Sequence, residues 1–314
     1  MIDAAAPRES DAAGRDGRAR SAAQLSYDVV STASADALPA YQELCRHALH
    51  APAQSPEWVR NWAGHLLPDG LIASISHKGR PVFALALEIE PAGPFRIARF
   101  MGGSHANGNF PALAPGWRGD LATMQSLMAA LASVRPDIDV VVLGRVAPDL
   151  QGEANPLLLL PHAPSPNVAL SVDLKAGFDA VLGQSGSRSK RKRHRADTRK
   201  FEAAGGFRRI EAKTFEETER LLEAFLDMKE RRFRAMGIAN VFADKRIKAF
   251  FHALFADALR AEAPPFTLQG LEVGGRLRAV TGTSRCGDFW TRSRPSAWTP
   301  PASTAATATP PPRR

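Results

Sequence analysis

The segment "SRSKRKRHRADTRK", Ser187 to Lys200, has the composition of an anion-binding surface, because eight of its residues are Lys or Arg and only one is Asp. On a helix, several of these cations would form like-charge pairs four residues apart, and each such pair costs about 0.2–0.5 kcal/mol. A bound anion would relieve this repulsion; a solvated surface helix is the alternative. We therefore predict that four cations of the segment bind the phosphates of a ligand or an acidic partner: Arg188, Arg191, Arg195 and Lys200.

The basic charge of the chain is local. The formal net charge is +9 and the sequence pI is about 10.0, but the residues outside this segment and Thr291–Arg314 are slightly acidic in sum. A protein that coats a polyanion is basic over a wider surface, and the segment has no interleaved aromatic residues that could stack on bases. We do not expect a nucleic-acid partner.

Metal and membrane sites are not expected from the sequence. Cys45 and Cys286 lie far apart, and neither belongs to a cluster with metal-ligand spacing. Residues 1–24 have mixed charges and no apolar core of a signal peptide, and no run approaches the roughly 20 apolar residues of a membrane span. We expect a cytoplasmic protein with reduced thiols, without a metal and without a membrane span.

Hydrophobic periodicity predicts the elements that must position any site. Strand-like and helix-like runs alternate from residue 25 onward, with a hairpin signal at "KGRP". Farther along, Gly205-Gly206 ends the basic helix, and Thr214 with Glu217 forms a capping box. Each half of the chain gives a strand, two helices and a meander of strands. The pattern predicts an α+β protein with two similar units: an N-terminal half at 25–174 and a C-terminal half at 175–287, after a disordered tail at 1–24.

The composition changes after Gly287. Residues 288–314 are rich in Pro, Ala, Thr, Ser and Arg, a mixture that cannot form a hydrophobic core. We predict a disordered tail here. Out-of-frame reading of a GC-rich gene gives the same mixture, and we favour that explanation over a native tail. The second half would then be truncated.

The stretch "MKERRFRAMGIANVFADKRIKAFFHALF", Met228 to Phe255, together with the basic segment, resembles the cellulose biosynthesis-associated acetyltransferases of the CelD/BcsL type. These are tandem GNAT-fold proteins related in architecture to the FemAB peptidyltransferases. The stretch "RFMGGSHANGNF" is similar to the Gly-Gly-x-His-x-Asn loop of that family. The resemblance extends from about Leu25 to Gly287.

The resemblance implies a GNAT-type N-acetyltransferase that moves an acetyl or acyl group from acetyl-CoA or another acyl-CoA to an amine. It implies a small-molecule or saccharide acceptor and a link to cellulose or exopolysaccharide biosynthesis. It also raises His105 as a proton acceptor or substrate contact and Asn107 as a substrate-binding residue, although turn formation alone explains asparagine and glycine here. Two alternatives stay open: a non-enzymatic module that docks an acidic partner through its basic helix, and a FemAB-like aminoacyl transferase.

The donor site is the weakest part of the resemblance. GNAT proteins hold the donor pyrophosphate on backbone N–H groups at a helix N-terminus. The run from Arg99 to Ser104 matches the corresponding motif only in part, and the residues after it predict a turn or substrate loop. The family's cradle is expected beyond Gly287, in a segment that this sequence lacks. We therefore expect weak acetyl-CoA binding, and a strand at Leu277 to Arg285 that is left as an unpaired edge.

Overall fold

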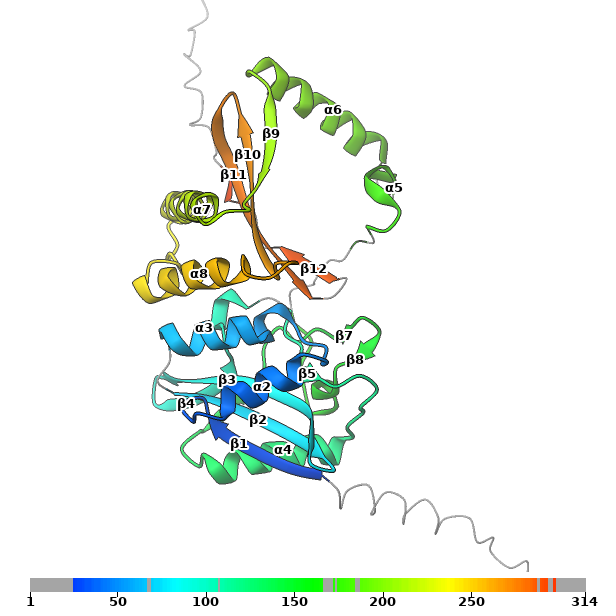
Figure 1. The fold of residues 1–314 in the computed structure, drawn as a ribbon, viewed down its shortest axis with the longest axis vertical. Coiled ribbons are helices and arrows are strands. Elements are labelled where there is room, and N and C mark those ends of the chain that lie inside the picture. The colour runs from blue at the N-terminus through cyan, green and yellow to red at the C-terminus, as the bar shows by residue number, and fades with distance from the viewer. Residues whose placement is uncertain are drawn as a thin grey trace, which may run out of the picture. The chain divides into compact units, whose positions relative to one another are not determined.

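The computed structural model describes residues 25–66, 69–106, 108–165, 172, 174–183, 187–286, 289–292 and 296–297. These residues form two compact units (Figure 1). Unit 1 contains the described residues up to 172, together with Asp244–Phe266 and the described part of Ser284–Thr291. Unit 2 contains Leu174–Ala243, Thr267–Thr283 and the described residues from Arg292 onward. Asp244–Phe266, which the sequence pattern assigned to the second half, thus packs within unit 1.

Unit 1 is built on a twisted sheet with the strand order β1-β2-β3-β4-β6, in which β5 also pairs with β3. Neighbouring strands are antiparallel except β4 and β6, which run parallel. The strands of the sheet are β1 (Leu25–Ser31), β2 (Gly70–His77), β3 (Arg80–Ala92), β4 (Phe95–Phe100), β5 (Ala112–Leu113) and β6 (Val140–Val142), and a separate small pair is β7 (Asp149–Leu150) and β8 (Glu153–Ala154).

Helices cover this sheet on both sides, with α2 and α3 on one side and α4 on the other (Figure 1). For that reason β3 is buried on both faces along most of its length, from Phe83 to Ile89. The helices of unit 1 are α2 (Ala37–Cys45), α3 (Pro56–Leu66), α4 (Leu121–Val134) and α8 (Lys245–Ala258), with 3-10 turns η1 (Pro52–Gln54), η2 (Gly103–His105) and η3 (Pro156–Leu159).

The "KGRP" hairpin is confirmed in unit 1, and the start of α3 follows from its own residues. Strands β2 and β3 are joined by Lys78 and Gly79, whose φ angles of 52° and 75° are those of a type I′ hairpin turn. Helix α3 begins at Pro56, and Ser55 Oγ accepts a hydrogen bond from the Trp58 backbone N–H at 3.2 Å. These turns fix where the strand and helix that carry the site begin.

An ion-pair network ties the edge of unit 1 together. The Arg135 guanidinium follows α4 and donates to Asp137 at 2.7 Å and to Asp69 at 2.8 Å. Arg96 of β4 donates to the same Asp69 carboxylate at 2.6 Å. The Arg135 hydrogen bonds lower the pKa of Asp137 to about 2 and also lower the pKa of Asp69. The network therefore joins the start of β2, the end of α4 and β4.

A second sheet, which lies mostly in unit 2, has the order β12-β11-β10-β9, and β13 also pairs with β11. The pairs β10–β9 and β11–β13 are antiparallel. The remaining elements of the chain are α5 (Gly177–Gly183), α6 (Ser187–Ala203), β9 (Phe207–Glu211), α7 (Phe215–Ala235), β10 (Phe266–Val273), β11 (Arg276–Cys286), β12 (Phe289–Arg292) and β13 (Ser296–Ala297). Phe266, Ser284–Cys286 and the first three residues of β12 are counted with unit 1. Both units combine helices with a mostly antiparallel sheet, so the predicted α+β class is confirmed.

The ends of the unit 2 helices also follow their sequence signals. Thr214 accepts a hydrogen bond from the Glu217 backbone N–H, and the Glu217 side chain accepts one from Thr214 in return, which is the predicted capping box. Helix α6 stops before Gly205. Gly274 approaches the same corner so closely that a Cβ there would lie 2.4 Å from the Ala204 carbonyl oxygen. Only glycine fits this position, at which the β10–β11 turn meets the end of α6.

Two expectations about the end of the chain are wrong for the described residues. Strand β11 is not an unpaired edge, because β10, β12 and β13 all pair with it. Residues 289–292 and 296–297, which lie in the segment predicted as disordered, form β12 and β13. Backbone hydrogen bonds to β11 can order such residues even where their composition builds no core. The rest of 288–314 lies outside the described residues, as does the predicted tail at 1–24.

Candidate active site

The site is built around the loop that follows β4. The Met101 backbone N–H donates to the Ala86 carbonyl of β3 at 3.1 Å, and the His105 N–H returns to the Gly102 carbonyl at 2.8 Å. Gly102 and Gly103 have φ angles of 108° and 46°. The chain forms the single 3-10 turn η2 here, as the predicted turn requires, and not the start of an α-helix. The loop therefore presents side chains and does not present a helix N-terminus.

Glycine is required at the first position of this loop. A Cβ on Gly102 would lie 2.8 Å from the Trp58 indole ring, which is too close for any side chain. The indole Nε1 of Trp58 is buried and has no hydrogen-bond partner among the described residues, and the same is true of Asn109 Oδ1. Buried polar atoms without partners are rare and costly, and they gather at functional sites.

The Arg145 side chain holds the backbone of this loop by hydrogen bonds. Its Nη1 donates to the carbonyl oxygens of Ser104 at 3.0 Å and Ala106 at 2.8 Å. The backbone around Arg145 is fixed in turn by Asn109, whose N–H donates to the Arg145 carbonyl at 2.7 Å and whose amide donates to the Gly144 carbonyl at 2.9 Å. The backbone on either side of His105 is thus held by one guanidinium.

Beneath the loop lies a buried carboxylate, Glu88 of β3. Its side chain is 4% exposed. Glu88 Oε2 accepts from Trp62 Nε1 at 2.6 Å, and Oε1 accepts from Arg99 Nε at 2.8 Å. Arg99 also forms an ion pair with Glu90. Burial raises the pKa of Glu88 above its usual range, although the Arg99 charge and the Trp62 hydrogen bond oppose this shift.

The loop held by Arg145 and the side chains around Glu88 come together at His105. Its half-buried ring lies 6.1 Å from the Trp62 ring and 5.5 Å from the Phe251 ring of α8, measured between centroids. Trp62 is itself fixed by Glu88 and by an edge contact with Phe250 at 4.9 Å. The imidazole is therefore positioned by aromatic contacts while it stays partly open to solvent. This arrangement suits a group that exchanges a proton with a bound amine.

The structure does not bring all predicted site residues together. His105 lies on the loop of unit 1, and Asn107 lies outside the described residues. Arg188, Arg191, Arg195 and Lys200 share the exposed helix α6 of unit 2. The run from Arg99 to Ser104 matches the phosphate-binding motif in part, but its arginine does not face an open phosphate site. The Arg99 side chain forms ion pairs with Glu88 and Glu90 instead.

Sequence reasoning missed the residues that support His105, namely Glu88, Trp62, Arg99 and Arg145. One signal was present in the sequence. Glu88 stands between Leu87 and Ile89 in a strand that is otherwise apolar, where an ionised residue needs a buried partner. The register pairs Glu88 directly with Arg99. No local pattern marks Trp62 or Arg145, because their contacts with the site arise only in the folded unit.

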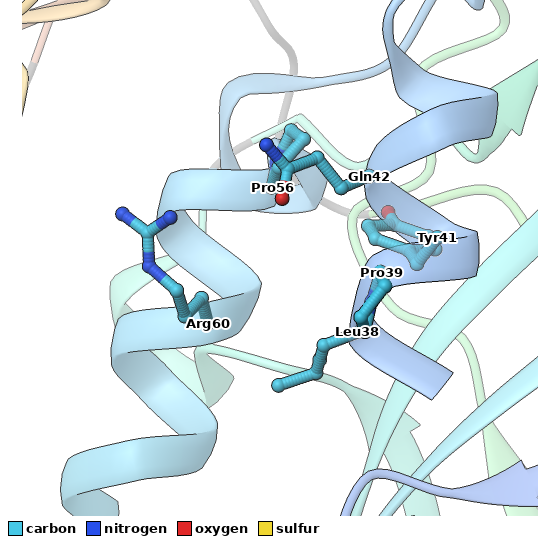
Figure 2. A pocket seen from close by; sticks show the side chains of 6 residues that line it. All are labelled: Leu38, Pro39, Tyr41, Gln42, Pro56 and Arg60. Carbon is cyan, nitrogen blue, oxygen red and sulfur yellow. The ribbon is translucent and has the colours of Figure 1, made fainter. Parts of the chain in front are cut away.

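A separate pocket of about 140 Å³ lies between α2 and α3 (Figure 2). It is lined by Leu38, Pro39, Tyr41, Gln42, Pro56 and Arg60. The Arg60 guanidinium at its rim donates to Asp257 of α8 at 2.9 Å. The pocket is much smaller than the roughly 300–1,000 Å³ of a typical ligand site. His105 and Glu88 are not among its lining residues, so it is a poor candidate for the reacting centre.

Neither a metal cluster nor a membrane-spanning helix is found in the described part of the chain. It contains no cluster of three or more His, Cys, Asp or Glu side chains that could hold a metal ion. None of its helices has the length and apolar character that crossing a bilayer requires. Both cysteines are free thiols, and burial raises the pKa of Cys45 to about 12, which makes it a poor nucleophile.

Comparison with known families identifies part of the chain. The family model described as an acetyltransferase (GNAT) domain matches residues 188–296. This range begins in α6 and ends in β13, so it extends past Gly287. The predicted GNAT domain is thereby confirmed for this range. A search of curated proteins gave no match.

The solved structures that match this chain are distant from it. A conserved protein of unknown function from Bacteroides thetaiotaomicron is 14% identical, with 82% of this chain and 75% of that chain covered and a TM-score of 0.45. A tandem GNAT protein from the clavulanic acid biosynthesis pathway is 12% identical, with 90% and 81% covered and a TM-score of 0.39. A Trypanosoma brucei acetyltransferase is 17% identical, with 47% and 99% covered and a TM-score of 0.29. None of these likenesses is close enough to assign a role to a residue.

Proposed function

We propose that the protein is a GNAT-type N-acyltransferase that uses acetyl-CoA or another acyl-CoA as donor and a small-molecule or saccharide amine as acceptor. The observation that carries this proposal is the match of the acetyltransferase (GNAT) domain to residues 188–296. GNAT chemistry needs the thioester held beside a neutral amine, a donor to the thioester carbonyl and a group that removes a proton. It forms no covalent enzyme intermediate and needs no metal.

His105 is the proposed proton acceptor. An amine must lose a proton as it attacks the thioester, and imidazole accepts protons near neutral pH. The geometry supports this role, because Arg145 and Trp62 fix the loop and the ring while His105 stays half-buried. Glu88 is a positioning residue, since it acts through its hydrogen bond to Trp62. Asn107, two residues after His105, is a proposed substrate contact, and the cations of α6 are proposed anion-binding residues.

The resemblance to cellulose-associated acetyltransferases supports an acceptor from cellulose or exopolysaccharide biosynthesis. The proposed location is the cytoplasm, as expected from the sequence. The same architecture would serve a FemAB-like aminoacyl transferase. That enzyme differs from an acyl-CoA-dependent transferase because its donor is aminoacyl-tRNA. The exposed basic helix favours a second candidate function, the docking of an acidic partner without catalysis.

Two observations support donor binding by this chain. The domain match continues past Gly287, and β11 is paired on both sides by described strands. We therefore expect acetyl-CoA to bind the purified chain with a Kd of about 1–100 µM, in the range common for enzyme substrates. Calorimetric titration of acetyl-CoA, with pantetheine as the control lacking the nucleotide, measures this directly. The absence of heat up to millimolar acetyl-CoA would favour the non-catalytic docking module, and a requirement for aminoacyl-tRNA would identify the FemAB-like alternative.

A further inference from the structure

Helix α6 stands apart from the core of unit 2. Along its 17 residues no side chain with a described environment is buried. Its contact with the sheet is at its C-terminal end, where the Phe201 ring lies 5.7 Å from the Phe207 ring of β9. Figure 1 shows the helix diverging from the sheet beyond this junction. Nearly the whole surface of α6 is therefore available to a partner.

Five of the cations on α6 share one face. With 3.6 residues per turn, they fall within about 100° of arc along about 16 Å of helix. We call this set the basic stripe, and its members are Arg188, Arg191, Lys192, Arg195 and Arg199. The stripe contains the like-charge pairs at four-residue spacing, so the repulsion within α6 is concentrated on this face.

The ion pairs of α6 lie on the face opposite the stripe. Asp197 lies 3.9 Å from Arg193 and 3.7 Å from Lys200. No member of the basic stripe has an acidic partner within 4.0 Å among the described residues. Glu202 lies on the same face at the C-terminal end of α6, so five cations face one carboxylate there. A face with this excess of positive charge is complementary to an anionic surface that is outside the unit.

Two exposed apolar side chains lie on α5 and just before it, and one of them contacts α6. Leu174 and Phe178 are 57% and 60% exposed. The Phe178 ring of α5 contacts the His194 ring of α6 at 5.3 Å, and His194 neighbours Arg191 around the helix. Large apolar groups with this exposure gain free energy when they leave water. The surface thus combines cations with apolar groups that can insert.

We propose that the basic stripe, together with Leu174 and Phe178, docks unit 2 on an anionic lipid bilayer. A bilayer surface is flat enough to contact all five cations at once, and it offers both phosphate or carboxylate headgroups and an apolar interior. Nucleic acid offers the phosphates, but an aliphatic side chain such as Leu174 does not stack on bases as an aromatic ring does. The inference does not rest on acyl transfer, because it concerns α5 and α6 alone.

The test is co-sedimentation of the full chain with phosphatidylcholine vesicles that contain or lack phosphatidylserine. R191Q/R195Q should weaken partitioning onto the anionic vesicles about 25-fold, because each basic residue near such a surface contributes about fivefold. The matched control is K190Q/R193Q, which removes the same charge from the other side of α6 and should change partitioning less than about threefold. L174S/F178S should weaken it about tenfold.

Each outcome decides the proposal. Preference for anionic vesicles, with selective loss in R191Q/R195Q and weakening at high salt, supports it. Equal losses in both double variants would show an effect of net charge only and would overturn the role of the stripe. Equal binding to neutral and anionic vesicles would overturn it as well. Tighter binding to a duplex or single-stranded oligonucleotide at the same salt concentration would identify a nucleic-acid surface instead.

Discussion

Replacing His105 with glutamine is expected to lower kcat/KM for acyl transfer by about 10²–10⁴, the range that general base catalysis contributes. Glutamine keeps the polar character of the side chain but cannot accept a proton at neutral pH. The half-buried ring packs on Trp62 and Phe251, so the substitution also removes some packing. The thermal midpoint of the variant must therefore be measured alongside the rate.

The pH profile separates proton transfer from positioning. If His105 accepts the proton, H105Q loses one ionisation from the pH dependence of kcat/KM, whereas a purely structural defect lowers the profile without changing its shape. The control is H162Q, because His162 is an exposed histidine of unit 1 that contacts only the Leu160 carbonyl among the hydrogen bonds found. A profile of unchanged shape in H105Q would show that another group removes the proton.

Replacing Glu88 with alanine is expected to lower the free energy of unfolding by about 3–5 kcal/mol, the cost of removing one partner from a buried ion pair. The substitution leaves the buried Trp62 N–H without its acceptor and removes one of the two carboxylates that pair with Arg99. Chemical denaturation measures the loss. The matched control is E90A, because Glu90 pairs with the same arginine but is 34% exposed, and it should cost about 1 kcal/mol or less.

The sign of the pH effect at Glu88 follows from its raised pKa. A carboxyl whose pKa is higher in the folded state stabilises the fold below its ordinary value of 4.5, and this contribution is lost as the pH rises through the raised pKa. E88Q stays neutral at every pH. Its stability relative to the wild type should therefore improve from pH 4 to pH 7. A relative stability that falls over this interval would contradict the assignment of burial as the dominant cause.

Local signals in the sequence predicted local structure well. The glycine after Lys78, the proline at the start of α3 and the pairing of Thr214 with Glu217 each determine the conformation of neighbouring residues. Such signals act over three or four residues, so they survive in any tertiary context. The α+β class follows from them because they divide the chain into strands and helices of ordinary length.

The tertiary environment of those elements could not be predicted in the same way. An all-valine run such as Val140–Val142 is typical of a buried strand, but β6 lies at the edge of the sheet and two of its valines are more than 40% exposed. Helix α8 follows α7 in sequence, yet Phe250 packs against Trp58 of α3 in unit 1. Both outcomes depend on contacts between residues far apart in the chain.

The candidate site shows the same division. The Gly-Gly turn and His105 could be predicted from the sequence, because glycine indicates a turn and histidine indicates a proton acceptor by residue type alone. The network that holds them was not, because Trp62, Glu88 and Arg99 come from three separate elements that meet only after folding. The basic stripe was partly visible, since its four-residue spacing is a property of one helix.

The measurement that tests the proposed activity most directly is transfer itself. The purified chain is incubated with acetyl-CoA and a panel of amines that includes amino sugars, and the acetylated amine and free CoA are quantified together by mass spectrometry. We predict equal amounts of the two products with at least one amine, at a rate that H105Q reduces at least 100-fold and H162Q leaves unchanged. Free CoA formation no faster than without protein, for every amine tested and at saturating acetyl-CoA, would contradict the assignment of acyl transfer to this chain.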